Sequence, residues 1–165
     1  MAPRVTIRPE GEGDHAAVEA LVGNVLGIAE ARLVARLRTA GDAVISLVAE
    51  RDGAVVGHIL FSPMRAPFRA LGLGPLAVDP DSQRQGIGGA LVGEGLSRAA
   101  AGGWDGVFVL GDPAYYTRFG FSAAGAAGFT CRYAGPHLML LALREPLPAR
   151  EGPVAYAPAF DALEE

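Results

Sequence analysis

A strand, a glycine-rich turn and a helix start follow one another within residues 75–91, and this segment constrains the fold most strongly. The apolar run Leu73–Val78 predicts a strand, and apolar periodicity predicts a helix from about Ile87. Gly86 and Gly88 let the backbone approach a ligand without a Cβ in the way. Because N–H groups at a helix start attract anions, the segment predicts a phosphate-binding loop suited to a pyrophosphate.

Two familiar phosphate loops do not fit this segment. The P-loop requires a Lys followed by Ser or Thr, and the chain contains no Lys. The dinucleotide fingerprint requires a third glycine where Leu91 stands, and it belongs near the start of a domain rather than in mid-chain. A plain helix start, with glycines that allow close packing, is the structural alternative.

Length and composition predict one globular domain over residues 1–165, whose residues 144–165 are a Pro- and Ala-rich extension. The net charge is −4, and all 14 cationic residues are Arg scattered along the chain. We therefore expect no nucleic-acid partner. The N-terminus lacks the apolar segment of a signal peptide, and no apolar run is long enough to span a membrane. We expect a soluble cytoplasmic protein with no membrane partner.

Cysteine and histidine content bounds the chemistry further. The single cysteine, Cys131, excludes an intrachain disulfide, and we expect it to be a small buried side chain rather than a nucleophile. His58 lies on a predicted strand, where packing is a more common role than base catalysis, and His137 begins a late strand. No pair of His or Cys has metal-ligand spacing, so we expect no metal site.

A second motif occupies residues 107–121. The apolar strand Val107–Leu110 is followed by a short helix that carries Tyr115 and Tyr116. Two consecutive strand–loop–helix units bring the phosphate loop and Tyr116 to the same end of a sheet. A phenol with a pKa near 10 can donate a proton to a thiolate leaving group. Tyr116 is therefore a candidate general acid, and Tyr115 is expected to pack in the core.

These two motifs resemble those of the GNAT N-acetyltransferase superfamily. Residues 78–88, Val-Asp-Pro followed after two residues by Gln-Arg-Gln-Gly-Ile-Gly, resemble its acetyl-CoA pyrophosphate motif Q/R-x-x-G-x-G/A. Residues 116–121, Tyr-Thr-Arg-Phe-Gly-Phe, are similar to its Y-x-x-x-G-F segment, whose Tyr is the usual general acid. The stretch 110–121 looks like the bacterial YhbS-like branch of predicted acetyltransferases. The resemblance covers about residues 4–143.

The resemblance and the order of elements imply an α/β fold. We expect a mixed, twisted sheet of six or seven strands with about four helices on its faces. The central strands should separate after Val78 to admit pantetheine. The predicted strands are 5–7, 44–50, 54–64, 73–78, 107–110 and a late antiparallel pair at 129–133 and 137–143, with 154–156 as a short edge strand. The first predicted helix begins after Asp14, which would cap it. The other predicted helices cover about residues 30–40, 87–101 and 114–119.

The resemblance also implies which residues contact acetyl-CoA. Backbone groups of Leu76, Ala77 and Val78 would pair with pantetheine in the manner of an added strand. The pyrophosphate would contact Gln83, Arg84, Gln85, Gly86, Ile87, Gly88 and Gly89. Tyr116 would be the catalytic residue and would also contact the cofactor.

Four features either have two alternative roles or depart from the wider family. Asp112 either contacts pantetheine or caps the short helix. Glu30 opens the second helix, where it either borders the acceptor or complements the helix dipole. Val109 stands where an Asn often precedes the Tyr, and no carboxylate occurs in residues 71–78, where many members carry the general base. The base is therefore remote, acts through water, or is not needed.

The sequence predicts an N-acetyltransferase that moves an acetyl group from acetyl-CoA to a primary amine by direct attack. Two alternatives stay open: a non-catalytic acyl-CoA-binding or sensor module, and a nucleotide-binding module. The acceptor is a small-molecule or peptide amine whose identity the sequence does not give. A homodimer is one possible assembly, since dimers are common in similar proteins.

Overall fold

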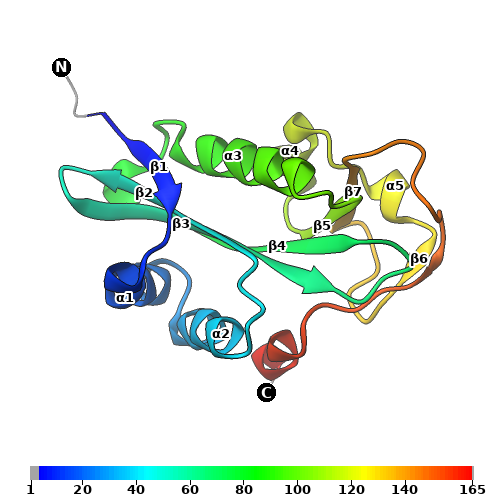
Figure 1. Cartoon of the computed structure of the whole chain (residues 1–165), viewed down its shortest axis with the longest axis horizontal. Helices are drawn as coiled ribbons and strands as arrows, with labels where there is room; N and C mark the ends of the chain where they lie inside the picture. The colour runs from blue at the N-terminus through cyan, green and yellow to red at the C-terminus, as the bar shows by residue number, and fades with distance from the viewer. Residues whose placement is uncertain (1–3, 165) are drawn as a thin grey trace.

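The computed structural model describes residues 4–164, which form a six-stranded mixed sheet with helices on both faces (Figure 1). The strand order in this sheet is β1-β2-β3-β4-β5-β7, and β4–β5 is its one parallel pair. The predicted α/β fold is confirmed.

The strands are β1 (Thr6–Pro9), β2 (Ile45–Arg51), β3 (Ala54–Met64), β4 (Ala70–Val78), β5 (Gly106–Leu110), β6 (Phe129–Thr130), β7 (Leu138–Ala142) and β8 (Gly152–Pro153). The α-helices are α1 (His15–Val25), α2 (Ile28–Thr39), α3 (Ile87–Ala101), α4 (Pro113–Tyr116) and α5 (Ala123–Ala126), and the 3-10 helices are η1 (Glu12–Asp14), η2 (Pro80–Ser82), η3 (Thr117–Phe119) and η4 (Pro158–Glu164).

Side chains that alternate between the two faces of the sheet divide the core into two layers. Figure 1 shows α3 on one face of the sheet and α1 and α2 on the other, with η4 beside α2. Ile59 and Phe61 of β3 pack beneath α3, whereas Leu60 between them packs against α1 and α2. All three are fully buried. The period of two along β3 therefore fills both layers.

Strands β4 and β5 are neighbours, as predicted, but they separate earlier than expected. Their pairing ends at Leu73 and Val109, and β4 continues to Val78 paired only with β3. The expected separation after Val78 was wrong. Pro75 has no N–H to donate to β5, and β4 carries one extra residue opposite β3 between Leu73 and Leu76. Both features turn the edge of β4 away from β5 within residues 74–78.

The predicted antiparallel pairing of residues 129–133 with 137–143 was wrong. Strand β7 pairs antiparallel with β5, from Gly106–Ala142 to Leu110–Leu138. Since β5 is apolar and buried, its second edge requires an apolar partner of similar length, which β7 provides. The two-residue β6 instead pairs in parallel with β8. The predicted edge strand at 154–156 reduces to one bridge between Ala155 and Arg65.

Asp14 stabilises the chain differently from the predicted helix cap. Its side chain makes no capping hydrogen bond to α1. It accepts hydrogen bonds from the Gly11 N–H and from Arg8 Nη1, each at 2.7 Å. The hydrogen bond from Arg8 is the main reason that the pKa of Asp14 falls to about 2. Asp14 thus joins β1 to the turn before α1.

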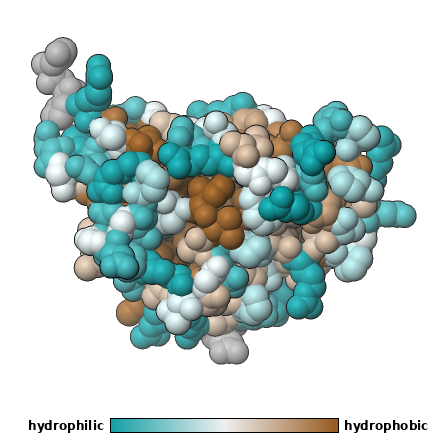
Figure 2. Space-filling model, in the orientation of Figure 1, coloured by the Kyte–Doolittle hydropathy of each residue, from teal (hydrophilic) through white to brown (hydrophobic). Residues whose placement is uncertain are grey.

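The surface in Figure 2 is mostly hydrophilic, with hydrophobic patches separated by polar side chains. Among the described residues, the most exposed large apolar side chain is Ile28 at the start of α2. Within residues 4–164, no helix combines the length and apolar character needed to cross a bilayer.

Two glycines of α3 predict opposite effects of substitution by Ala. A Cβ on Gly95 would lie 2.2 Å from Cε1 of the fully buried Phe61, whereas a Cβ on Gly93 would meet no atom within 4 Å. Gly95→Ala should therefore lower the free energy of unfolding by about 1–3 kcal/mol through overpacking. Gly93→Ala should raise it by up to about 1 kcal/mol through helix propensity. Urea denaturation measures both, and stabilisation by Gly95→Ala would contradict the packing of α3 on β3.

Candidate functional site

Residues 83–89, here called the phosphate loop, present a row of free backbone N–H groups at the start of α3. Gly86 is the N-cap and has a left-handed φ of 81°, which favours glycine. The four N–H groups from Gly86 to Gly89 donate to no protein acceptor within residues 4–164; the next amide, Ala90, bonds to the Gly86 carbonyl at 3.0 Å. Such a row, at the positive end of a helix dipole, binds anions.

A pocket of about 630 Å³ opens over this loop. Tyr115 forms part of its wall, and its hydroxyl lies 2.8 Å from where a Cβ on Gly88 would stand. The guanidinium of Arg118 lies 4.2 Å from the centre of the Tyr115 ring. Arg118 and Arg84 add positive charge beside the free N–H groups. The remaining lining residues are Val25, Leu26, Leu76, Val78, Ser82, Gln83, Gly86, Ile87, Gly88 and Gly89.

Sequence reasoning missed five of these residues: Val25, Leu26, Ser82, Tyr115 and Arg118. Tyr115 was expected in the core, and Arg118 was not singled out. The sequence did contain a signal for Arg118, because it is the one cationic residue in the second motif, residues 107–121, and could have been predicted to contact an anion. The contact between Tyr115 and Gly88 joins segments far apart in the sequence, so no local pattern could indicate it.

Four predicted cofactor residues lie outside this pocket's lining: Ala77, Gln85, Asp112 and Tyr116, which is described below. The Ala77 side chain is buried against α1 and α2. Gln85 lines a neighbouring pocket and accepts a hydrogen bond from Arg51. Asp112 caps α4 by accepting a hydrogen bond from the Ala114 N–H at 2.9 Å. Their contact with the cofactor stays a prediction.

Tyr116 packs beside the separated strands. A Cβ on Gly111 would lie 2.5 Å from the Tyr116 ring, so glycine makes room for the ring at the end of β5. The ring packs edge-on against Phe121 at 5.8 Å. Burial, with a smaller effect of Tyr115, raises the pKa of Tyr116 to about 12. The phenol therefore carries its proton throughout the neutral pH range.

A second pocket, here called the split pocket, lies where β4 and β5 separate. It has a volume of about 250 Å³ and is lined by Leu73, Gly74 and Pro75 of β4 and by Leu110 of β5. Glu30, in the first turn of α2, also lines it. Its carboxylate lies beside the N-cap residue Gly27, so both expected roles, contact with the acceptor and complementing the helix dipole, stay open. Its other lining residues are Leu33, Tyr133, Tyr156, Phe160 and Leu163.

The open edge of β4 connects the two pockets. Leu73, Gly74 and Pro75 line the split pocket, and Leu76 and Val78 line the pocket over the phosphate loop. The Tyr116 ring packs against Gly111, which directly follows Leu110 of the split pocket. The predicted acid is therefore near the place where the strands part.

His58 is placed where it cannot reach either pocket. It is fully buried, its Nδ1 lies 3.0 Å from the Leu47 carbonyl, and its Nε2 has no hydrogen-bond partner in the described part of the chain. Burial is the main cause that lowers the pKa of His58 to about 4, so the ring is neutral at neutral pH.

The other candidate ligands lie elsewhere. His137 is exposed, with its Nδ1 3.2 Å from the Gly111 carbonyl, and Cys131 is half-buried with a free thiol. Across the described part of the chain, no three His, Cys, Asp or Glu side chains are grouped to hold a metal ion.

Comparison with known proteins identifies the fold and the family. The family model described as "Acetyltransferase (GNAT) domain" matches residues 42–123. The chain is 43% identical over 111 residues to the uncharacterized N-acetyltransferase YhbS of Escherichia coli K12. It is 40% identical over 116 residues to the uncharacterized N-acetyltransferase YjhQ of the same strain. These matches span 65% of this chain and 66% and 64% of the two relatives, respectively.

Solved structures extend the similarity to nearly the whole chain. The structure of the GNAT-family N-acetyltransferase YhbS from Escherichia coli in complex with CoA has a TM-score of 0.91 and 36% identity, over 98% of this chain and 94% of that one. The structure of a GNAT-family acetyltransferase from Brucella melitensis in complex with acetyl-CoA has a TM-score of 0.79 and 38% identity, over 96% and 99%.

Burial of His58 predicts a pH-dependent stability. The folded-state pKa of about 4 lies below the ordinary value of 6.5, so the unfolded state binds more protons between these pH values. The stabilisation is complete above pH 6.5 and is lost as the pH falls toward 4. Between pH 7 and pH 5 the parent should lose about 2 kcal/mol more than His58→Leu. Urea denaturation at both pH values tests this, and equal losses would contradict it.

Proposed function

Because the chain belongs to the GNAT acetyltransferase family, we propose that it binds acetyl-CoA and transfers the acetyl group to a primary amine. The observation that carries this proposal is the row of four free N–H groups at Gly86–Gly89, beside a β4 edge that leads into the split pocket. A pyrophosphate and an extended amide-bearing chain are the two chemical groups that such a surface accommodates. The solved relatives bind CoA and acetyl-CoA, which supports the same ligand here.

The phosphate loop would bind the pyrophosphate through its N–H groups, with Arg84 and Arg118 adding charge. The edge of β4 from Gly74 to Val78 has no strand partner on the β5 side among the described residues. Its free amide and carbonyl groups would hydrogen-bond pantetheine as an added strand does. This arrangement directs the thioester toward the split pocket.

Transfer would proceed by direct attack. The neutral amine forms a C–N bond to the thioester carbonyl carbon, the C–S bond breaks, the amine loses a proton and the departing thiolate gains one. The protein contributes by holding both reactants together and by polarising the carbonyl with a backbone N–H of β4. No metal is needed for these steps.

Tyr116 is the residue that we propose protonates the thiolate. Its raised pKa keeps the phenol protonated, so a proton is available at each turnover. A thiol is normally a stronger acid than a phenol, so the phenol would stabilise the thiolate mainly by a hydrogen bond and complete the transfer as charge develops. Glu30, the one carboxylate in the lining of the split pocket, would assist loss of the amine proton.

One observation favours the alternative of a non-catalytic acyl-CoA-binding module. Strand β4 carries no carboxylate in Ala70–Val78. This alternative predicts tight acetyl-CoA binding without release of CoA in the presence of any amine. Free-thiol release across an amine panel, together with calorimetric binding of acetyl-CoA, separates the two functions.

The phosphate loop gives the first functional prediction. Gly88→Glu places a side chain and a negative charge among the free N–H groups, so affinity for CoA should fall at least tenfold in a calorimetric titration. Gly93→Glu is the matched control, since it lies on the same helix where a Cβ meets nothing within 4 Å. Unchanged CoA affinity in folded Gly88→Glu would place the ligand elsewhere.

Removal of the Tyr116 hydroxyl gives the second functional prediction. In Tyr116→Phe the ring still packs, so KM for acetyl-CoA should stay within a few-fold while kcat drops about 10²-fold. Tyr115→Phe is the control, because Tyr115 contacts the phosphate-loop pocket and should alter KM rather than kcat. Steady-state kinetics resolve both constants. A kcat of Tyr116→Phe within twofold of the parent would remove Tyr116 from the reaction.

A further inference from the structure

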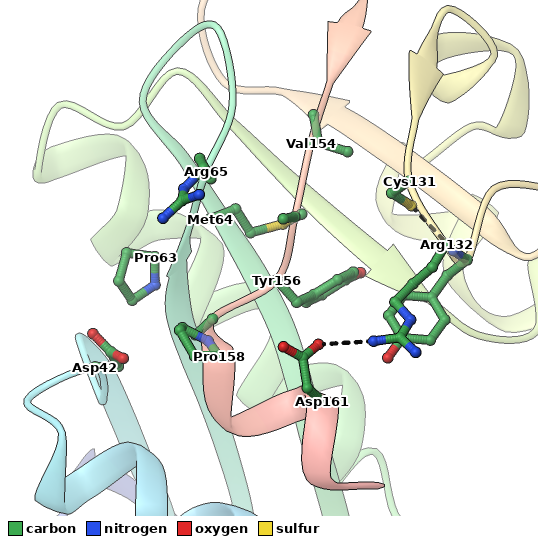
Figure 3. Close-up of a pocket in the computed structure, with 13 residues that line it drawn as sticks. Asp42, Pro63, Met64, Arg65, Cys131, Arg132, Val154, Tyr156, Pro158 and Asp161 are labelled. Atoms are coloured by element: carbon green, nitrogen blue, oxygen red, sulfur yellow. Dashed lines mark hydrogen bonds and ion pairs between the residues drawn. The ribbon is translucent and has the colours of Figure 1, made fainter. Parts of the chain in front are cut away.

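The C-terminal segment, residues 152–163, forms a fixed wall of the split pocket. Ala155 exchanges two backbone hydrogen bonds of 2.9 Å with Arg65, at the end of the β3–β4 hairpin. Figure 3 shows Asp161 of the same segment hydrogen-bonded to Arg132, at 3.1 Å. Helix η4 then packs against α2. These contacts hold Tyr156, Phe160 and Leu163 in place beside the open strands.

Tyr156 occupies the centre of this wall. Its ring fills the space above Gly72 of β4, where a Cβ would lie 2.6 Å from ring atom Cε1. The ring packs against Tyr133, with centroids 5.9 Å apart, and against Phe160 at 5.1 Å. In Figure 3 the Tyr156 ring extends from the C-terminal segment toward the side of Cys131 and Arg132. The Tyr156 and Phe160 rings of this wall therefore form one aromatic cluster with the Tyr133 ring.

The Tyr156 hydroxyl is buried and has no hydrogen-bond partner within residues 4–164. Burial raises the pKa of the Tyr156 phenol well above its ordinary value. An unpartnered buried hydroxyl costs about 1–3 kcal/mol, so native structures retain few of them. Because the hydroxyl is inaccessible to solvent, the part of Tyr156 that faces the split pocket is its aromatic ring.

The lining of the split pocket is almost entirely apolar. Besides the aromatic rings it consists of leucines, a proline and a glycine, and Glu30 is the one charged residue. The Glu30 carboxylate makes no hydrogen bond or ion pair within residues 4–164. At about 250 Å³, the pocket has the volume of about eight water molecules. It suits a small ligand with one cationic and one apolar end.

We propose that the split pocket selects, as acceptor, a small primary amine that carries an aromatic or bulky apolar group. Glu30 binds the ammonium, and Tyr156, Phe160 and Leu163 contact the apolar group. This inference rests on the proposed acetyl transfer. It adds the acceptor class and gives the C-terminal segment the role of a specificity element.

Charge and desolvation explain the selection. A primary amine is cationic in neutral solution, so an unpaired carboxylate at the pocket attracts it, and aromatic faces add cation–π attraction. A hydroxyl-rich amine would bury hydroxyls against leucine and phenylalanine, where they lose their hydrogen bonds to water. A neutral aromatic alcohol would leave Glu30 without a partner. The pocket therefore discriminates on both ends of the ligand.

Three probes separate these requirements: 2-phenylethylamine, ethanolamine and 2-phenylethanol. With acetyl-CoA, free-thiol release should give a kcat/KM for 2-phenylethylamine at least about tenfold above that for ethanolamine. Calorimetric titration into the CoA-loaded protein should show the same order of affinity. 2-Phenylethanol should bind at least about tenfold more weakly than 2-phenylethylamine.

Two variants connect this preference to the residues. Glu30→Gln should weaken 2-phenylethylamine about tenfold and leave 2-phenylethanol unchanged. Phe160→Ala should weaken both about tenfold. Glu94→Gln, on the exposed side of α3, and Leu147→Ala, in the same extension but lining a different pocket, should each stay within twofold of the parent. Unchanged CoA affinity in every variant verifies that the fold is intact.

Each contrary result has a distinct meaning. Equal or better use of ethanolamine, or a 2-phenylethylamine affinity that ignores Glu30 and Phe160, overturns this inference and leaves acetyl transfer standing. Failure of the parent to bind acetyl-CoA overturns the proposed function. Selective amine binding without thiol release supports the ligand class but contradicts catalysis.

Discussion

Separation of β4 from β5 is the constraint on which the rest of the site depends. Their pairing stops at Leu73 and Val109, so the last residues of β4 keep one edge free of any strand within the described chain. Pro75 and the extra residue in β4 enforce this, because neither continues a regular ladder. The opening creates both the track that leads to the phosphate loop and the split pocket beside it. Regular pairing to Val78 would close them.

The phosphate loop and the split pocket use opposite physical means. In the loop, free N–H groups and two guanidinium groups form a polar, exposed surface that suits a highly charged pyrophosphate. The split pocket is apolar and carries a single carboxylate. Tyr116 lies near the junction, where its buried ring keeps the phenol protonated. The same fold thus separates the binding of charge from the region proposed for chemistry.

Local patterns in the sequence were sufficient to predict the long helices, the strands β2 to β5 and the turn before α3, but not the short elements α5, β8 and η4. The glycines at 86 and 88 and the strand before them indicated the phosphate loop because its function depends on backbone, which glycine spacing reports. Long-range pairing was harder: residues 138–142 joined β5 instead of 129–130, since strand partners are chosen by burial across the sheet rather than by neighbouring sequence. The contacts of Tyr115 with Gly88 and of Tyr156 with Gly72 were equally invisible, because each joins segments distant in sequence.

A crystal structure of this protein with CoA tests the central claim most directly. The account predicts the pyrophosphate within hydrogen-bonding distance of the N–H groups of Gly86–Gly89, pantetheine along Gly74–Val78, and the sulfur between Pro75 and Leu110 beside Tyr116. Pantetheine that lies away from the β4 edge, or a pyrophosphate bound outside residues 83–89, would contradict it.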